Sequence, residues 1–381
     1  MAYCDHNATA PLRPEAREAL ERALAVTGNP SSVHAHGRAA RAMVEGARAA
    51  VGSLVKAEAD RVIFTSGATE ANSLALWGAI EGAAEAGEAV TRLIVSAIEH
   101  ESVLNNGRLV AGWLGLGLEI VPVTSEGVVD TATLASLLSG DHGRALVAMM
   151  AANNETGVIQ PIADVSCLCR ERNALLLVDA VAAAGKTPLD AGLCDYMSLS
   201  AHKLGAPQGV GGLIVGKNAP LRPQLLGGGQ QQGLRAGTEN LSGIAAFGAA
   251  ARAVLEGVEE VRRVAFLRDA FEAKLHAALP QAAIAGAGAP RVGNTSSVVL
   301  KALSSENVLI ALDLDGVMVS SGSACSSGKI APSHVLAAMG VGEDRAAIRV
   351  SFGWNSVAAD ADQVVASLVK FCARADAREA A

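Results

Sequence analysis

The sequence predicts an α/β protein with a large domain built on a mainly parallel sheet and a smaller α+β domain after it. Over roughly the first 260 residues, short apolar runs alternate with longer helical patterns. The apolar runs are almost continuous, as in strands that helices cover on both faces. Beyond a long helical stretch the alternation stops and shorter strand-like runs follow. Together these observations indicate two different layered domains.

The first domain is expected to contain seven buried strands. Their runs cover residues 61–66, 92–98, 118–123, 145–151, 174–180, 195–200 and 211–216. Helical patterns between or before the earlier strands cover residues 14–25, 68–80 and 101–114.

The second domain begins inside the long helical stretch 240–279, with the break expected around 255–265. The strand-like runs NTSSVVLKAL and GVMVSSGS and a closing helix near 358–377 follow it. We therefore expect three parts. They are an N-terminal segment, 1–14, that packs with the small domain, a large domain, 15–260, and a small C-terminal domain, 261–381.

Charge and hydropathy exclude several classes of protein. The 381 residues contain 31 Lys and Arg against 38 Asp and Glu, a net charge of −7, and no basic tract. This balance argues against nucleic-acid binding and against peripheral membrane binding. No signal peptide is visible at the N-terminus. The longest uncharged stretch, 16 residues after Lys274, contains two prolines and is too short for a bilayer span.

Cysteine usage favours a reducing compartment. Six cysteines in a chain of this length do not form a typical disulfide framework. Cys167 and Cys169 are separated by one residue, which is poor spacing for a metal site, and no built-in metal site is expected. We therefore expect a cytoplasmic protein.

Lys203 and Asp179 are the first candidates for chemistry. Lone lysines are usually surface residues, and a carboxylate at a strand end usually caps a turn. Lys203, however, follows a buried-type strand in SLSAHKLGAPQGVGG, and Asp179 ends the run LLLVDA. A partly desolvated lysine forms a Schiff base with an aldehyde cofactor, and a carboxylate pairs with a pyridinium nitrogen. The pair therefore suits pyridoxal phosphate (PLP).

A phosphate site is expected at TSGATEAN, residues 65–72, between a strand and a helix. Gly67 would allow a tight turn, and the amides of Ala68 and Thr69 would face the anion, helped by the Thr69 hydroxyl. An ordinary strand–helix turn is the alternative. Ser200 and His202 lie within short reach of any phosphate bound beside Lys203.

Cys325 differs from the other cysteines. It lies in SSGSACSSG, where small polar residues and glycines make a poor core and a good mobile loop. A free cysteine is often only a small buried hydrophobe, but one on such a loop can reach a substrate and then a partner. The remaining cysteines lie in strand-like or helix-like settings and are interpreted as structural.

These pieces together resemble the cysteine desulfurases of the NifS/IscS type, within the class-V aminotransferase family of fold-type I PLP enzymes. The similarity covers nearly the whole chain, in order. It rests on YCDHNATAP, GNPSSVHAHG, FTSGATEAN, EHESVL, NNETGVIQPI, VDA, SAHKLGAPQGVGG, GLRAGTEN, SSGSACSSG and IRVSFG.

The resemblance implies a role for each matching residue. Lys203 would form the Schiff base, Asp179 would pair with the pyridinium nitrogen, and His100 would stack on the ring. The phosphate would be held by Ala68, Thr69, Ser200 and His202, and by Thr238 from the partner subunit of a homodimer with shared active sites. Asn154 would contact the cofactor's phenolic oxygen and the substrate, and Arg349 would clamp the substrate carboxylate.

The implied reaction converts L-cysteine to L-alanine. Lys203 or His100 would move the Cα proton, and the Cys325 thiolate would attack the substrate sulfur and keep it as a persulfide for a sulfur acceptor. That acceptor would serve iron–sulfur cluster or other thio-cofactor synthesis, and Cys325 could transiently ligate a cluster. The family usually has a glutamine where this chain has Ala182, which leaves one cofactor contact in doubt.

Three alternatives stay open at this point. The chain could be a selenocysteine lyase, another class-V transaminase or lyase, or a non-enzymatic sulfur-carrier or scaffold subunit. The Cys325 loop favours sulfur chemistry over plain transamination, and Lys203 and Asp179 argue against a silent subunit.

Overall fold

The structure is a computed structural model. It describes the chain except residues 141, 302–303, 323–332, 343–344 and 380–381.

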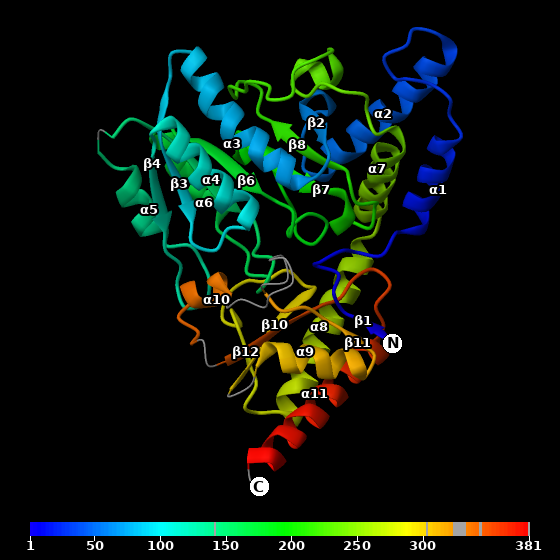
Figure 1. Cartoon of the computed structure of the whole chain (residues 1–381), viewed down its shortest axis with the longest axis vertical. Coiled ribbons are helices and arrows are strands. Elements are labelled where there is room, and N and C mark those ends of the chain that lie inside the picture. Colours follow the sequence, from blue (N-terminus) through cyan, green and yellow to red (C-terminus); the bar gives the residue numbers. More distant parts are fainter. Residues whose placement is uncertain (141, 302–303, 323–332, 343–344, 380–381) are drawn as a thin grey trace.

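A seven-stranded sheet forms the centre of the upper part of the molecule in Figure 1. Its order is β2-β8-β7-β6-β5-β3-β4, and β8 runs in the direction opposite to all the other strands of this sheet. The strands are β2 (Val62–Thr65), β3 (Val90–Ser96), β4 (Gly117–Val121), β5 (Arg144–Met150), β6 (Leu175–Asp179), β7 (Tyr196–Ser200) and β8 (Gly211–Val215). The prediction of a mainly parallel sheet from seven apolar runs is confirmed.

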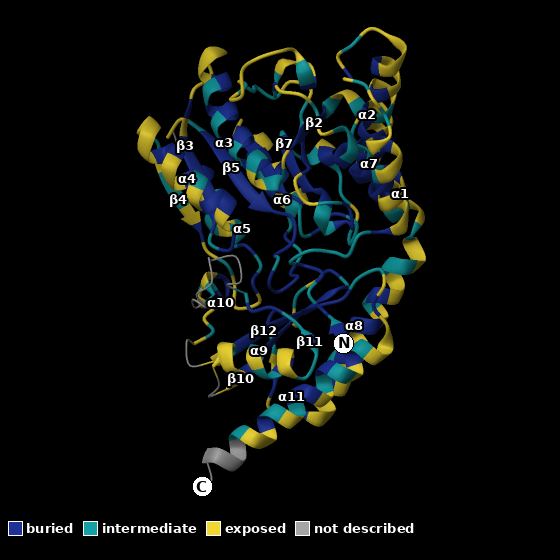
Figure 2. Cartoon of the chain, turned by 45° about the vertical axis from the view of Figure 1, so that its right-hand side comes forward, coloured by how far each residue is buried: buried dark blue, intermediate teal, exposed yellow. Residues whose placement is uncertain are grey.

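Helices cover both faces of this sheet, and successive strand residues point to opposite faces. Ile63, for example, packs with α3 (Ala68–Glu85) and α4 (Glu101–Leu114), whereas its neighbour Phe64 packs on the other face. Five helices contribute to that other face. They are α1 (Pro14–Leu24), α2 (Ala35–Leu54), α5 (Thr131–Leu138), α6 (Ile162–Glu171) and α7 (Leu241–Glu256). Figure 2 shows the buried strands between these partly exposed helices.

A second hydrophobic core lies below the large sheet in Figure 1. It packs α8 (Val258–Ala278), α9 (Ser305–Leu314) and α11 (Ala358–Glu379) against a three-stranded antiparallel sheet. That sheet has the order β12-β10-β9. Its strands are β9 (Ala283–Ile284), β10 (Thr295–Lys301) and β12 (Arg345–Ser351).

The N-terminal residues join this second core. β1 (Ala2–Tyr3) pairs in parallel with β11 (Val317–Met318), and Cys4 is fully buried in the same core. Helix α10 (His334–Ala338) belongs to a smaller apolar cluster that includes Ile98 and Met150, at the junction with the large sheet. The domain limits at residues 14 and 260 stay a prediction.

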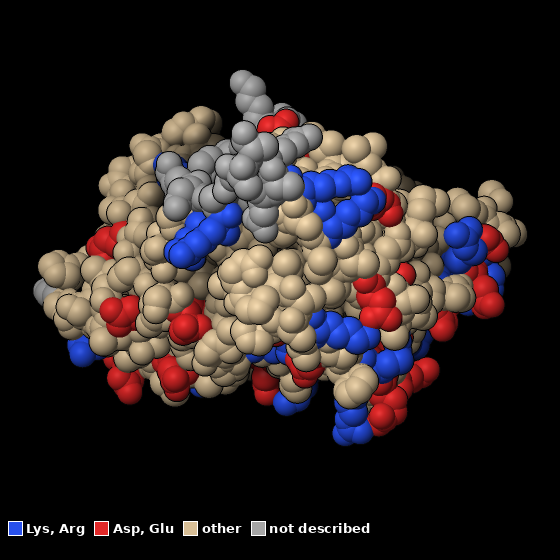
Figure 3. Space-filling view, turned by 90° about the horizontal axis from the view of Figure 1, so that it is seen from below, with Lys and Arg blue, Asp and Glu red and all other residues tan. Residues whose placement is uncertain are grey.

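The long helical stretch consists of two helices, because α7 and α8 meet at Gly257 with a bend of 75°. In the part of the chain that the structure describes, no single helix has the length and hydropathy to cross a membrane. The bent pair α7 and α8 meets that test together, by length and composition only. On the face seen from below, acidic and basic side chains are interspersed (Figure 3).

Candidate active site

One pocket, with about 370 Å³ of space, collects most of the predicted site residues. It lies at the carboxyl ends of β2, β3, β5, β6 and β7, where the strand-to-helix connections of a parallel sheet build binding sites. Nine of the residues proposed from the sequence line it. They are Ala68, Thr69, His100, Asn154, Asp179, Ser200, His202, Lys203 and Arg349. Its volume is typical of a small-ligand site.

Asp179, at the end of β6, is held by amide donors. Its Oδ2 accepts from Nδ2 of Asn72 at 2.9 Å, and its Oδ1 accepts from the Val181 amide at 3.0 Å. Asn72 also donates to the Ser102 hydroxyl at 3.0 Å, so α3 and α4 together orient this carboxylate. Asp179 is 6% exposed and forms no ion pair with any described residue. A buried carboxylate without a cation is a fitting partner for a protonated pyridine nitrogen.

The phosphate loop between β2 and α3 presents a helix N-terminus to the pocket. α3 begins at Ala68, so the amides of Ala68 and Thr69 have no partner within the helix. Gly67 does not form the tight turn that its residue type predicts. Its φ of 163° is extended, and an added Cβ would meet nothing within 4 Å. The close backbone contact is instead at Gly211, where an added Cβ would lie 2.7 Å from Cα of Gly67. The open space beside Gly67 leaves room for an anion.

Glu70 and Arg235 tie the glycine-rich loop of residues 225–240 to the start of α3. Nε of Arg235 lies 2.8 Å from Oε1 of Glu70. Burial alone would raise the pKa of Glu70, but hydrogen bonds from Arg235 and Ser66 outweigh it and lower the pKa. Thr238 lies three residues further on, exposed, and it is not among the residues that line this pocket.

Lys203 projects from the turn after β7 toward the N-terminal segment. Its Nζ donates to the carbonyls of Asn7 and Ala8, the latter at 2.8 Å. His202 lies beside it, with Nδ1 3.2 Å from the Thr9 hydroxyl. Burial and the charges of Lys203 and Lys186 lower the pKa of His202 to about 4. A neutral His202 can donate one hydrogen bond to a phosphate.

His100 is the N-cap of α4. Its Nδ1 accepts from the Ser102 amide at 3.1 Å and lies 2.8 Å from the Ser102 hydroxyl. Since Nδ1 is an acceptor, the proton of the neutral ring is on Nε2. His100 thus serves the helix and also lines the pocket.

Arg349 reaches the pocket from β12, on the other side from the large sheet. Its guanidinium pairs with Asp5 at 2.9 Å and donates to the Asn154 carbonyl at 3.2 Å. Its buried Nε has no partner among the described residues. The charge expected to bind a substrate carboxylate therefore lies at the pocket, already oriented by Asp5.

Cys325 lies outside the described residues, so its place relative to the pocket is not defined. Of the other cysteines, Cys4, Cys169 and Cys372 are buried, and burial raises the thiol pKa of Cys4 and Cys169 to about 12. Cys167 is exposed on α6. Within the described residues, no cluster of three or more His, Cys, Asp or Glu has the arrangement of a metal site.

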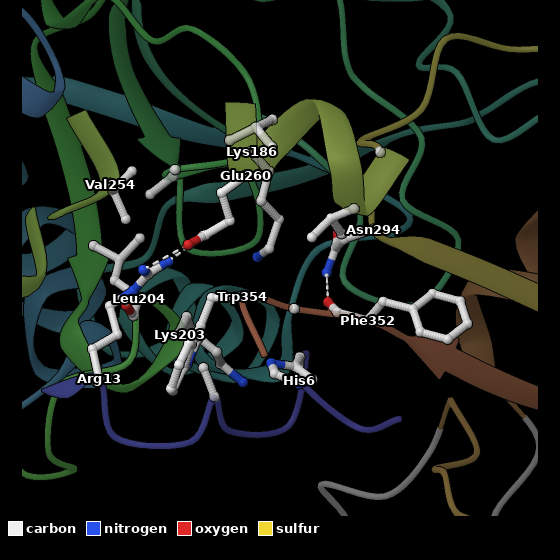
Figure 4. Close-up of a pocket in the computed structure, with 17 residues that line it drawn as sticks. His6, Arg13, Lys186, Lys203, Leu204, Val254, Glu260, Asn294, Phe352 and Trp354 are labelled. Carbon is white, nitrogen blue, oxygen red and sulfur yellow. Dashed lines mark hydrogen bonds and ion pairs between the residues drawn. The ribbon is translucent and has the colours of Figure 1, made fainter. Parts of the chain in front are cut away.

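Lys186 is a pocket residue that no motif singled out. It lines the main pocket and also a smaller cavity behind Lys203, where Figure 4 shows its amine pointing toward the interior. Its Nζ donates to the Ala182 carbonyl at 2.9 Å. Burial and the charges of Lys203 and Arg349 lower the pKa of Lys186 to about 7. The only sequence signal is its position in VDAVAAAGK, seven residues after Asp179.

Comparison with known proteins gives a consistent result over the full length. The family model for aminotransferase class-V matches residues 2–364. The chain is 35% identical to an IscS-like cysteine desulfurase of Mycobacterium tuberculosis, over 98% of this chain and 97% of that protein. It is 40% identical to a cysteine desulfurase of Cereibacter sphaeroides, over 95% and 93%. The solved structure of a NifS-like protein from Rickettsia africae is similar, with a TM-score of 0.87, 30% identity, and coverage of 97% of this chain and 99% of that one.

Proposed function

Because the chain belongs to the aminotransferase class-V family, we propose that it is a PLP-dependent cysteine desulfurase that moves the sulfur of L-cysteine to Cys325. One observation carries this proposal. Nine residues from distant motifs, each expected to have a role in PLP binding or amino-acid binding, line a single pocket. If each motif served only as a turn, a helix cap or a packing element, the motifs would have no reason to gather at one cavity.

The residues present fit PLP at three points. Asp179 offers a buried carboxylate for the pyridine nitrogen, the N-terminus of α3 offers free amides and open space for the phosphate, and Lys203 offers an amine for the aldehyde. Bound there, the cofactor would supply an electron sink for charge that develops at the substrate Cα. Asn72 and Ser102 would keep Asp179 oriented, and Ser200 and His202 would complete the phosphate contacts.

The substrate would lie between the large sheet and β12. Arg349 would bind its carboxylate, and Asn154, whose backbone carbonyl accepts from Arg349, would contact the substrate beside it. Lys203, which lines the pocket, would remove the Cα proton. His100 carries its proton on Nε2 while its Nδ1 accepts from the Ser102 amide, so it would act as a proton donor. The Cys325 thiolate would then attack the substrate sulfur. The new sulfur–sulfur bond forms as the carbon–sulfur bond breaks, and the bonding pair stays on Cβ. Cβ then takes up a proton, the proton removed by Lys203 returns to Cα, and alanine leaves.

Labelled cysteine tests the proposal directly. The wild-type protein should carry the label as a persulfide on the tryptic peptide that contains Cys325. Cys325→Ser should still bind PLP and cysteine, because neither needs this thiol, and should make neither sulfide nor alanine. Cys167→Ser is the matched control, because Cys167 is exposed on α6. Its sulfide release should equal that of the wild type.

Label on Cys4, Cys167, Cys194 or Cys372 would contradict the sulfur route. Keto-acid production without sulfide release, measured over a panel of amino acids, would instead indicate a transaminase.

A homodimer with shared active sites belongs to the same proposal. Thr238 is exposed and lies outside the residues that line this chain's pocket, which supports a contact with the phosphate of a partner subunit. Sedimentation analysis of the PLP-bound protein should give twice the chain mass. The delivery of sulfur to an iron–sulfur scaffold or another acceptor, in the cytoplasm, is the remaining part of the proposal.

A further inference from the structure

A single buried carboxylate contacts both residues that border the segment 323–332, which carries Cys325. On one side, an added Cβ at Gly322 would lie 1.9 Å from Oε2 of Glu155, so Gly322 lies directly against this oxygen. On the other side, the Ser333 hydroxyl donates to the same Oε2 at 2.5 Å. Glu155 is only 3% exposed. The two borders, eleven positions apart in the chain, therefore meet at one atom.

Glu155 is itself fixed by a tight turn. The Asn153 side chain accepts from the amides of Glu155 and Thr156 at 2.9 and 3.0 Å, and donates to the Ile98 carbonyl at 3.1 Å. This turn also contains Asn154, which lines the pocket. The carboxylate thus links the two border residues to a hydrogen-bonded turn in the pocket wall.

The surroundings of Glu155 are those of the reaction site. Burial raises its pKa, and the hydrogen bond from Ser333 and the nearby guanidinium of Arg349 act in the opposite direction. Ser333 is also the N-cap of α10, since its hydroxyl accepts from the Leu336 amide at 3.1 Å. Holding Ser333 therefore also holds the start of α10.

We propose that Glu155 is a positioning residue that fixes both borders of the Cys325 segment beside the substrate pocket. The inference rests on the proposed function. A nucleophile on a segment with two pinned ends explores a smaller volume, which raises its effective concentration at the substrate sulfur. Glu155 touches neither substrate nor cofactor in this account, and it acts only through Gly322 and Ser333.

Other contacts near the borders do not use Glu155. Ser320 pairs through its backbone with Arg349 and donates from its hydroxyl to Asp5 at 2.7 Å. Nε2 of His334 lies 3.0 Å from the Glu99 carbonyl. Ser320 and His334 therefore keep these contacts when Glu155 is changed. The substitution is thus expected to alter the position of Gly322 and Ser333 without unfolding this part of the protein.

The first experiment compares Glu155→Ala with the wild type in single turnovers with labelled cysteine. We expect persulfide formation on Cys325 to slow by at least tenfold. The cysteine concentration that half-saturates the spectral change of the bound cofactor should move by less than threefold. Glu155→Gln should recover most of the rate, because an amide oxygen still accepts from Ser333. Glu126→Ala is the matched control, because exposed Glu126 accepts from the Gly288 amide in another loop, and its rate should be unchanged.

The second experiment uses Gly322→Ala alone and together with Glu155→Ala. The methyl group should slow the single variant, because it would overlap Oε2 of Glu155. In the double variant it should add no further loss, because the opposing oxygen is gone. Ser333→Ala removes only one hydroxyl and should slow persulfide formation threefold to tenfold. If Glu155→Ala does not fold, the rate of Ser333→Ala is sufficient to test the proposal.

Several results would overturn the inference. A wild-type rate of persulfide formation in Glu155→Ala or Ser333→Ala would do so. Losses that multiply in the double variant, or an equal loss of cysteine binding and sulfur transfer, would also do so. A wild-type protein that never labels Cys325 would instead refute the proposed function, so the two failures are distinguishable.

Discussion

Replacing Glu99 by glutamine would show how a buried acid beside the site affects stability. Glu99 is fully buried, its Oε1 accepts from the Ser96 hydroxyl and the Met150 amide, and its Oε2 has no partner among the described residues. Burial raises the pKa of Glu99 from 4.5 to about 8, against the two hydrogen bonds, and the charge of Asp179 adds to the rise.

The sign of the pH effect follows from proton binding. Between pH 4.5 and 8 the native protein keeps the proton on Glu99, whereas the unfolded chain has released it. Stability from this group is therefore fully present below pH 4.5 and is lost as the pH rises toward 8. At about 1.4 kcal/mol per pH unit, the upper limit of the loss is about 5 kcal/mol.

A glutamine at position 99 has no titratable proton and nearly the same side-chain volume as glutamate. Its amide oxygen can accept from the Ser96 hydroxyl and the Met150 amide. The melting temperature of Glu99→Gln relative to the wild type should therefore rise between pH 5 and pH 8. The three pH units from 5 to 8 account for about 4 kcal/mol of this loss. With an unfolding entropy of ~2 cal/mol/K per residue over the whole chain, that corresponds to a rise of up to about 5 °C. Any cost of an unpaired amide is constant with pH and does not affect this slope.

Differential scanning calorimetry of the PLP-bound proteins across this pH range measures the slope. Glu126→Gln, at an exposed glutamate, is the control and should show none. A melting-temperature difference that stays flat from pH 5 to 8 would refute the view that Glu99 is protonated in the native protein.

Two further substitutions test the cofactor site. Lys203→Ala should abolish turnover and the absorbance of the lysine-bound cofactor, and a borohydride-reducible link to PLP in that variant would show that another lysine, with Lys186 the nearest candidate, is the anchor. Ala182→Gln should restore a donor toward the cofactor's phenolic oxygen, since Ala182 lines the pocket. One hydrogen bond of ~1 kcal/mol should lower the pH midpoint of the bound cofactor's spectral titration by about 0.7 units. An unchanged or higher midpoint at full PLP occupancy would contradict this role.

The sheet and most of the pocket are predictable from local sequence. Each strand of a parallel sheet is buried on both faces, so each is visible as an apolar run, and all seven runs became neighbouring strands. Parallel strands place their strand-to-helix loops at their carboxyl ends, along the same edge of the sheet, so motifs such as TSGATEAN and EHESVL meet there. Asp179 and Lys203 follow the same rule, since each lies at or just after a strand end.

Other features depend on packing between distant segments. The helical patterns named from the sequence do not include residues 35–54, where glycines at 37, 46 and 52 lower the helix propensity. The helix α2 forms against α7, where an added Cβ at Gly248 would lie 2.4 Å from Cα of Ala47. Such close contact between helices is a property of the fold, and short sequence windows do not contain it.

The sequence by itself thus determined the strands, the residue types at their ends and the family resemblance. The tertiary structure alone decided how Asn72 orients Asp179, how Lys186 enters the pocket and how Glu155 joins two borders of one segment. Glu155 and Ser333 are 178 residues apart in the chain, and Asn72 and Asp179 are 107 apart. Hydrogen bonds and desolvation act over a few ångströms in space, whereas periodicity and motifs act along the chain, so only folding reveals these partners.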